Sequence, residues 1–490
     1  MSIKEENIRL IFGLKVKQYR QRAGYSASEL ARICGLSPSY LTEIEKGKKH
    51  PKPEKVMSLA QALNVEYEEL LSLKLEKGLL PVEELLTSNT LQNLPLELFG
   101  LDPSSIVDLV SNDPIKTSAF ISTIVEIARN YEMSQENFYH SALRSYQELH
   151  DNYFEDLEKE AQQFLNESSI KILGKKRVKQ LSEYLQDTYG YSIQYKEFNQ
   201  PLQAIRSVYI PEKGLLMINQ SLSENQVSFI LAREIAFNFL KLDPRPYTFS
   251  WLKVESFELL LNNFKASYVA GAILMPEEEL TKDFQAFLSS KTWKAETLKS
   301  LLTKYRVSAE MFFHRITNLL SPHFGIESFF FLRFVNDPRT EKYFLTKEMH
   351  ISRLHNPHGN LLDEHYCRRW ITIGLLQNIK KSNKDELIFG AQISRYHESD
   401  NSYLCISMAK QTRPGTDSNA SLTLGLLIKP SSKRKIGFLK DPSIINRVVN
   451  ATCERCPIND CKERVAPPRE IRKRDTDTLL ENALKKLGTT

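Results

Sequence analysis

The chain has 490 residues, several times the length of a usual single domain, which predicts roughly two to four domains. Its composition, 41% apolar and 26% charged, excludes a chain that is mainly disordered, collagenous or embedded in a membrane. Lys and Arg total 66 against 60 for Asp and Glu, so the net charge of +6 is small for this length. A surface that binds nucleic acid must therefore be local.

The ends and the apolar runs of the chain bear on its location. Residues 1–10 contain no apolar core of the kind found in a signal peptide. The most apolar run, residues 267–276, is too short to span a bilayer and ends in a proline. We therefore expect a cytoplasmic protein that does not engage a membrane.

Hydrophobic patterning divides the chain into four segments and predicts a multidomain protein, mainly α, with an α+β C-terminal part. Residues 1–75 are predicted to form a domain of five short helices, with breaks at Gly13, Gly24, Gly35 and Gly47, and residues 76–165 a helical linker or dimerisation region. Within the second segment, residues 139–165 look like one long helix. Residues 166–325 alternate strand-like and helical patterns, and residues 326–490 contain further strands and a cysteine cluster.

Individual elements follow from the same patterns. In the third segment, short strands are predicted at 194–200, 204–210 and 213–219, and buried helices at 227–240 and 264–276. In the fourth segment, strands are predicted at 329–334, 386–396 and 403–409, and a charged helix at 475–487.

The first segment contains the spacing of a helix–turn–helix. Ser26 can cap one short helix that Gly35 ends, and Ser37 can cap the next, with Pro38 at its first position. This next helix stops at Gly47. The predicted inner face consists of Leu30, Ala31, Cys34, Leu36, Leu41 and Ile44.

Polar and basic residues remain on the outer face of this second helix and just beyond it. They are Ser37, Pro38, Ser39, Tyr40, Thr42, Glu43, Lys46, Lys48 and Lys49. Residues 1–75 hold 13 Lys or Arg against 9 Asp or Glu, so this segment carries +4 of the whole chain's +6. The pattern favours a DNA-reading helix, and the alternative is a small helical bundle with a solvated basic end.

Residues 13–65 are similar along their whole length to the phage-repressor and xenobiotic-response-element type of helix–turn–helix domain. The resemblance implies binding to double-stranded operator DNA as a homodimer, with Pro38, Ser39 and Glu43 facing base edges. It also places Ser37, Lys46 and Lys48 at phosphates. An ion pair between Arg20 and Glu45 would join the first helix to the third. Where that family commonly has a Gln that contacts DNA, this chain has Ala27, so its base preference is not transferable.

Two apolar helical stretches in the third segment, residues 229–240 and 262–280, resemble the ImmA/IrrE type of metallopeptidase. That family binds zinc through an HExxH helix and a later acidic ligand. Here Arg233 and Phe237 stand at the two His positions, Asn263 stands at the acidic position, and Glu234 alone is retained. We therefore expect no catalytic residues and no enzyme activity, only a retained scaffold. A DNA-associated metallopeptidase is the alternative.

The fourth segment carries the sequence CERCPINDC, which places Cys453, Cys456 and Cys461 on one tight loop. A CxxC turn brings two thiolates to one metal, and Cys367 is the best candidate for a fourth ligand. Zinc, an iron–sulfur cluster and reduced free thiols all remain open, with His365 as a substitute ligand. The other two cysteines, Cys34 and Cys405, are expected in apolar cores.

The order of these parts, ending in CERCPINDCKERVAPP, resembles the short-chain fatty acyl transcriptional regulators, which include the bacterial propionate and acetate pathway regulators. The resemblance implies a one-component regulator of carbon or fatty-acid metabolism genes that senses a short-chain acyl-CoA-like effector. It further implies a [4Fe–4S] cluster held by Cys367, Cys453, Cys456 and Cys461. Arg368 and Arg369 would offset the cluster's negative charge or meet a CoA phosphate. A structural zinc without redox sensing is the alternative.

Overall fold

The computed structural model describes residues 5–75, 123, 126, 134–249, 253–337, 342–351, 364–379, 387–397, 399, 401–411 and 419–486. The chain divides into two compact units, Met1–Tyr146 with Lys253–Asn262, and Gln147–Leu252 with Asn263–Thr490. Most of the predicted linker or dimerisation region, residues 76–133, lies outside the described residues, and the domain boundaries at 75, 165 and 325 stay predictions.

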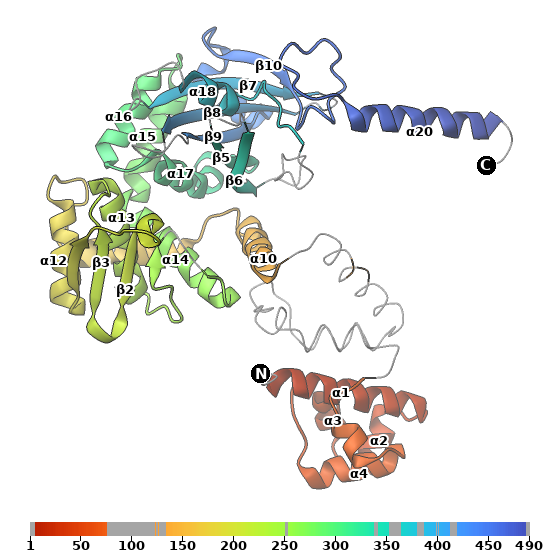
Figure 1. Cartoon of the computed structure of the whole chain (residues 1–490). Coiled ribbons are helices and arrows are strands. Elements are labelled where there is room, and N and C mark those ends of the chain that lie inside the picture. Colours follow the sequence, from red (N-terminus) through yellow and green to blue (C-terminus); the bar gives the residue numbers. More distant parts are fainter. Residues whose placement is uncertain are drawn as a thin grey trace. The chain divides into compact units, whose positions relative to one another are not determined.

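The first unit contains the N-terminal helices α1 (Glu5–Arg22), α2 (Ala27–Ile33), α3 (Pro38–Glu45), α4 (Pro53–Leu63) and α5 (Tyr67–Leu71) (Figure 1). Their apolar faces meet in one core that includes Val16, Leu30, Leu41 and Leu59. Gly13 lies inside α1, so its prediction as a break between helices was wrong. It lets α1 cross the end of α3 closely, because a side chain there would clash with the main-chain oxygen of Ile44.

Two helices, α10 (Gln135–Leu149) and α11 (Glu155–Glu167), replace the single helix predicted for residues 139–165, so that prediction was wrong. Asp151 and Asn152 break the helix with left-handed φ angles of 50° and 57°. Asn152 is buried, and its amide donates to Thr317 Oγ1 at 3.0 Å while its own main-chain oxygen accepts from Asn318 at 2.9 Å. These tertiary hydrogen bonds stabilise the break.

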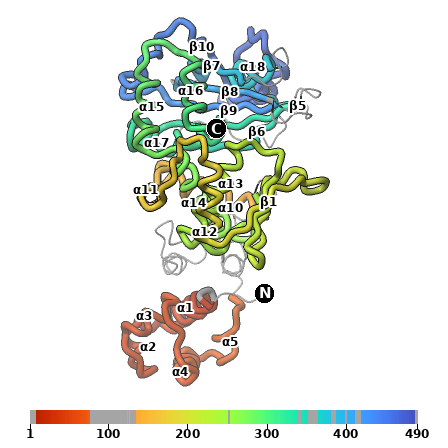
Figure 2. The backbone as a smooth tube through the Cα atoms, turned by 90° about the vertical axis from the view of Figure 1, so that its left-hand side faces the viewer, coloured from red at the N-terminus to blue at the C-terminus, as the bar shows by residue number. Residues whose placement is uncertain are grey.

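The next part of the chain forms a four-stranded sheet in the order β1-β3-β2-β4, in which β1 and β3 are parallel and the other pairs antiparallel. Its strands are β1 (Ser192–Lys196), β2 (Ser207–Ile210), β3 (Leu215–Asn219) and β4 (Thr248–Phe249). The flanking helices are α12 (Arg177–Tyr189), α13 (Glu224–Phe239) and α14 (Phe257–Leu274) (Figure 2). The three strands and two helices predicted here are confirmed, with shifted ends.

Helices α15 (Glu277–Ser289), α16 (Ala295–Tyr305) and α17 (Ala309–Phe324) lead into a six-stranded sheet in the order β10-β7-β8-β9-β5-β6. Its strands are β5 (Phe329–Asp337), β6 (Lys342–Ile351), β7 (Ile388–Tyr396), β8 (Ser402–Gln411), β9 (Asn419–Leu427) and β10 (Ile445–Val449). The shorter elements of the second unit are η3 (Leu202–Ala204), η4 (Pro211–Lys213), α19 (Pro430–Lys433) and η5 (Gly437–Lys440).

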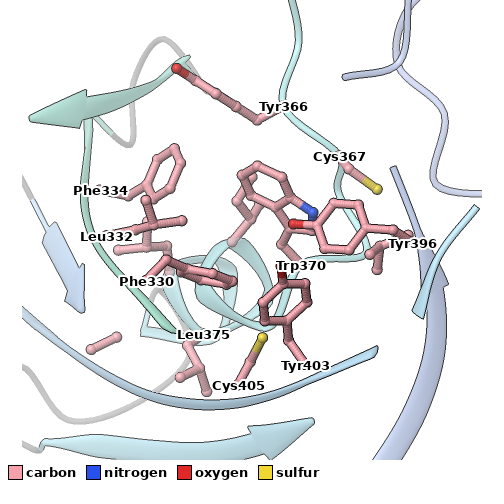
Figure 3. Packing of buried hydrophobic residues seen from close by; sticks show 14 of the residues in the cluster. Phe330, Leu332, Phe334, Tyr366, Cys367, Trp370, Leu375, Tyr396, Tyr403 and Cys405 are labelled. Atoms are coloured by element: carbon pink, nitrogen blue, oxygen red, sulfur yellow. The ribbon is translucent and has the colours of Figure 1, made fainter. Parts of the chain in front are cut away.

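Helices cover both faces of this sheet. Phe330, Leu332 and Phe334 of β5 share a buried cluster with Trp370 and with helix α18 (Ile371–Ile379) (Figure 3). Phe331 points to the opposite face, because side chains alternate along a strand, and its ring lies 4.3 Å from that of His314 on α17. The last helix, α20 (Arg469–Lys486), projects away from the sheet and has no buried residue (Figure 1). Among the described residues, no helix is long and apolar enough to cross a membrane.

Candidate functional site

The helix–turn–helix is fixed by two N-caps that the sequence predicts. Ser26 caps α2 in a capping box, in which the Ser26 main-chain nitrogen donates to Glu29 at 2.8 Å. Ser37 caps α3 by accepting from the main-chain nitrogen of Tyr40 at 3.1 Å. The caps set where each helix begins, and therefore which residues of α3 point outward.

The outer face of α3 is solvent-accessible as expected for a reader helix. Leu41 and Ile44 are fully buried on its inner face. The predicted DNA-contacting residues lie on the other side: Ser37, Pro38, Ser39, Thr42, Lys48 and Lys49 are exposed, and Tyr40, Glu43 and Lys46 are half-buried. The structure thus brings the nine residues to one surface, and their individual contacts with DNA stay predictions.

Several of these side chains already have partners within the domain. Thr42 Oγ1 donates to the main-chain oxygen of Pro38 at 2.9 Å, and Ser39 Oγ lies 3.1 Å from Ser37 Oγ. Lys49 Nζ lies 2.9 Å from Glu43 Oε2, and this hydrogen bond raises the pKa of Lys49. A base or phosphate that contacts either side chain would therefore compete with this ion pair.

The ion pair between Arg20 and Glu45, expected from the resemblance, is confirmed. Arg20 Nε donates to Glu45 Oε1 at 2.5 Å and Nη2 donates to Oε2 at 3.0 Å. Glu45 is buried, and Arg20 Nη1 also donates to the main-chain oxygen of Tyr25 at 2.9 Å. One guanidinium thus joins α1, the loop before α2 and the end of α3.

The positions that would hold zinc in a metallopeptidase form a cationic cluster in the second unit. Arg233 on α13 donates from Nη2 to Asn263 Oδ1 on α14 at 2.7 Å, and its Nη1 lies 3.5 Å from Glu234 Oε1. Its guanidinium carbon lies 4.7 Å from the centre of the Phe237 ring. Arg233 therefore contacts the residues at all three other positions of the former motif.

Glu234, the retained residue of that motif, is held by a second arginine. Arg245 donates from Nη2 to Glu234 Oε2, and Tyr191 donates to the same oxygen at 3.2 Å. Arg245 Nη1 donates in turn to the Tyr191 hydroxyl at 3.1 Å. Because both carboxylate oxygens face cations, Glu234 is placed as a counter-ion. No spacing pattern in the chain points to Arg245 or Tyr191, and the sequence analysis missed both residues.

The cysteine loop is joined to the segment that carries Cys367. Tyr366 and Thr452 form an antiparallel bridge, the Cys453 main-chain nitrogen donates to His365 at 2.8 Å, and the Cys367 nitrogen donates to Ala451 at 3.1 Å. The side chain of Glu454 accepts from the His365 main-chain nitrogen at 2.9 Å and lies 2.8 Å from His365 Nδ1. His365, the substitute ligand, is thus bonded to Glu454.

The thiols lie near one another, but they are not arranged as ligands of one metal ion. Cys367, Cys453 and Cys456 are each 6% exposed, and Cys461 is more accessible. Burial, and to a smaller extent the nearby Cys453 and Cys456, raise the pKa of Cys367 to about 11. In the part of the chain that the structure describes, no three His, Cys, Asp or Glu side chains are placed as ligands of one metal ion.

Arg464, which the sequence analysis did not single out, organises the loop. Its Nη1 donates to the main-chain oxygen of Cys453 at 2.7 Å, and its Nη2 donates to those of Cys456 at 2.9 Å and Ile458 at 2.6 Å. Of the two predicted charge-offsetting arginines, Arg369 donates to Glu463 beside Cys461 at 3.2 Å, whereas Arg368 lies against the Tyr343 ring. In the sequence, the CxxR spacing that begins at Cys461 could have pointed to Arg464.

Comparison with known proteins matches two parts of the chain to known families. Residues 16–70 match the helix-turn-helix family, and residues 186–317 match the IrrE N-terminal-like domain. The uncharacterized HTH-type transcriptional regulator YazB of Bacillus subtilis is 33% identical over 60 residues, which cover 12% of this chain and 87% of YazB. The chain belongs to the HTH-type transcriptional regulators.

The regulator has a longer relative. The HTH-type transcriptional regulator RamB of Mycobacterium tuberculosis is 22% identical over 344 residues, which cover 66% of this chain and 68% of RamB. A solved structure titled Mycobacterium tuberculosis transcriptional regulator matches with a TM-score of 0.49 and 19% identity, over 67% of this chain and 94% of that one. The two family matches, together with the six-stranded sheet, make the regulator a DNA-binding protein with an IrrE-like domain and a sheet-containing C-terminal region.

Proposed function

We propose that this HTH-type transcriptional regulator binds operator DNA as a homodimer and senses a short-chain acyl-CoA-like effector, with an iron–sulfur cluster in its C-terminal domain. The observation that carries the DNA-binding part is the outer face of α3, where nine polar, basic or turn residues gather opposite the buried Leu41 and Ile44. Lys–phosphate contacts would position the domain and a few side chains of α3 would read bases.

Selection from random double-stranded DNA tests the DNA-binding part. The expected result is enrichment of a sequence with two-fold symmetry, because a homodimer presents two copies of α3 to two half-sites. Footprinting of the enriched sequence with the full-length protein should protect both half-sites together. Enrichment of a single asymmetric site would contradict the dimer, and the absence of any enriched sequence would contradict operator recognition.

The acyl-CoA part is supported by the resemblance of the whole chain, from the N-terminal helices to CERCPINDCKERVAPP, to regulators that sense such compounds. An effector acts only if it binds one arrangement of the regulator better than the other. Titration of the operator complex with propionyl-CoA, with free CoA as the control, tests this part. A shift in operator affinity with propionyl-CoA alone is expected, and an equal effect of both compounds would contradict acyl recognition.

Burial, main-chain links and nearby cations support a four-cysteine site, although the described thiols are not arranged as ligands of one metal ion. Three of the four thiols are buried, the loop is joined to the Cys367 segment by main-chain bonds, and Arg464 and Arg369 bring positive charge close to where thiolates would form. When bound, an iron–sulfur cluster would supply a one-electron redox centre, whereas zinc would form a structural site that stabilises the fold of the loop. Ligation requires deprotonated thiols, so the raised pKa of Cys367 predicts that binding releases its proton.

Two cysteine variants separate the alternatives at this site. Protein purified without oxygen should show visible absorbance with stoichiometric iron and sulfide, and Cys456→Ser should lose both. Cys405→Ser is the matched control, because burial raises the pKa of Cys405 to about 12 and the residue lies on β8, within the sheet. A colourless wild type with one equivalent of zinc would support the structural-zinc alternative, and metal-free protein would exclude both.

The absence of peptidase activity is also part of the proposal. Arg233 and Phe237 replace the zinc-binding histidines, and Glu234 accepts hydrogen bonds from Arg245 and Tyr191. Incubation of the purified regulator with zinc and a casein substrate should yield no cleavage above that of Glu234→Gln. Zinc-dependent cleavage that Glu234→Gln abolishes would restore the metallopeptidase alternative.

A further inference from the structure

The cluster around Arg233 holds more positive than negative charge. Arg233 and Arg245 carry two cations, and Glu234 is the carboxylate that acts electrostatically on both of them. The side chains of Arg233 and Glu234 are each 2% exposed and that of Arg245 is 11% exposed. The cluster of these three residues therefore has a surplus of one positive charge in a largely dry environment.

Hydrogen bonding at the two arginines is incomplete as well. The Nε atoms of Arg233 and Arg245 are buried and have no hydrogen-bond partner among the described residues. Each Nε is a donor on a charged group, and a buried donor of this kind that has no acceptor destabilises the folded state. The two Nε atoms thus lack acceptors, and the cluster lacks one negative charge to balance its two arginines.

Two other buried arginines of the second unit are bonded at every guanidinium nitrogen. Arg177 donates from Nε to Ser228 and from its two Nη atoms to the main-chain oxygens of Tyr305 and Arg306. Arg315 donates from Nε to Met275 and from both Nη atoms to the carboxylate of Glu158. In both cases, every guanidinium nitrogen has an acceptor.

We propose that the cluster of Arg233, Glu234 and Arg245 is a binding site for a small monovalent anion. One negative charge balances the surplus, and one acceptor atom beside an Nε satisfies a buried donor. The occupant is the size of chloride or formate, because aromatic rings crowd the guanidinium groups. Phe237 and Phe249 lie 4.7 and 4.9 Å from the guanidinium carbon of Arg233, and Tyr209 lies 4.5 Å from that of Arg245.

The anion would connect two helices and a loop in the IrrE-like domain. Arg233 on α13 is already bonded to Asn263 on α14, and Arg245 follows α13 in the chain. Burial lowers the pKa of Arg233 to about 10, so its guanidinium is still charged at neutral pH. An anion beside it would strengthen this junction between α13 and α14. The proposal goes beyond the DNA, effector and cluster binding proposed above and does not rest on them.

Thermal unfolding of the full-length regulator tests the proposal. Sodium chloride and sodium formate are compared with sodium gluconate at constant ionic strength, because gluconate is too large for the site. The expected result is a saturable rise in melting temperature with chloride and with formate only, as for any ligand that binds the native state alone. Equal melting temperatures in all three salts would overturn the proposal.

Asn263→Asp provides the decisive variant, since it places a fixed carboxylate where Arg233 Nη2 now meets an amide oxygen at 2.7 Å. This variant should lose the chloride-dependent rise, with apparent chloride affinity weakened at least about tenfold. Asn263→Ser, which adds no charge, should keep the rise. Arg245→Gln removes one of the two positive charges, so this variant should also lose the chloride-dependent rise in melting temperature. Chloride dependence that persists in both charge variants would assign the effect to another site.

Discussion

Arg20 on α1 and Glu45 at the end of α3 form a two-point ion pair, with Nε–Oε1 at 2.5 Å and Nη2–Oε2 at 3.0 Å. The Arg20 side chain is 12% exposed and that of Glu45 is 7% exposed. Since α3 carries the predicted DNA-reading residues, this pair fixes the orientation of the reader helix against the longest helix of the domain.

Glu45→Leu is expected to destabilise the N-terminal domain by about 3 kcal/mol, because it leaves the Arg20 guanidinium buried without its carboxylate. Arg20→Met combined with Glu45→Leu should cost less than Glu45→Leu alone, since the double variant buries no unpaired charge. Hydrogen exchange of α1 and α3 amides in the full-length protein measures both values. A double variant less stable than Glu45→Leu would mean that packing, and not charge pairing, dominates here.

Changes on the outer face of α3 should separate sequence reading from general DNA affinity. Ser39→Ala with Glu43→Ala should reduce discrimination between operator and random DNA by about 1–3 kcal/mol, because these side chains are predicted to face base edges. Lys48→Ala should weaken binding to both DNAs alike and lower the salt dependence by about one ion, as expected for a lost phosphate contact. Fluorescence anisotropy at several salt concentrations measures both effects. Equal losses on operator and random DNA from both variants would refute the assigned roles.

The N-terminal domain was the part best predicted from sequence, and its local signals explain why. Ser26, Ser37 and Gly47 act within a few residues of their position in the chain, so a cap or a left-handed glycine can be read without knowledge of distant contacts. The break between α10 and α11 could not be read in this way. It depends on hydrogen bonds from Asn152 to α17, more than 160 residues later in the chain.

The C-terminal sheet was predicted incompletely because its strands differ in burial. Strand β8 was predicted from an apolar run. Strand β6 lies at an edge of the sheet and is mostly exposed or half-buried, so it lacks such a run. Strand β10 pairs in parallel with β7, which lies about 50 residues earlier in the chain. The cysteines were recognisable from spacing alone. Their support was not, since Glu454 and Arg464 act through main-chain contacts that only the folded loop creates.

Arg464→Gln should loosen the cysteine loop without changing a thiol. Arg464 donates to the main-chain oxygens of Cys453, Cys456 and Ile458, and each hydrogen bond from a charged group contributes about 1.5–3 kcal/mol. We expect faster modification of Cys453 and Cys456 by a thiol reagent in metal-free protein, and a lower iron or zinc content after purification. Mass spectrometry of the labelled peptides measures the first effect.

Arg472→Gln, on the exposed helix α20, is the matched control for this change and should leave thiol reactivity unaltered. Arg464→Lys keeps the charge but can reach fewer of the three oxygens, so it should give an intermediate rate. If Arg464→Lys restores wild-type protection fully, charge alone accounts for the role of Arg464, and the hydrogen bonds to the loop do not.

The half-buried His314 on α17 should make the second unit sensitive to mild acid. Burial, and then the nearby Lys347, lower the pKa of His314 from 6.5 to about 4, although Glu310 opposes the shift. The unfolded chain therefore takes up a proton below about pH 6.5 that the folded protein accepts only near about pH 4. The stability contributed by neutral His314 is complete above about pH 6.5 and is lost as the pH falls toward about 4.

When the pH falls from about 7 to about 5, protonation of His314 should lower the free energy of unfolding by about 2 kcal/mol. His314→Gln should abolish this part of the pH dependence of stability. Glu310 does not interfere in this range, because Lys347, His314 and Arg333 outweigh burial and hold its pKa at about 2. Urea unfolding at several pH values, with the exposed His150→Gln as control, measures the difference. An unchanged slope in His314→Gln would show that His314 takes up its proton equally in the folded and unfolded chains.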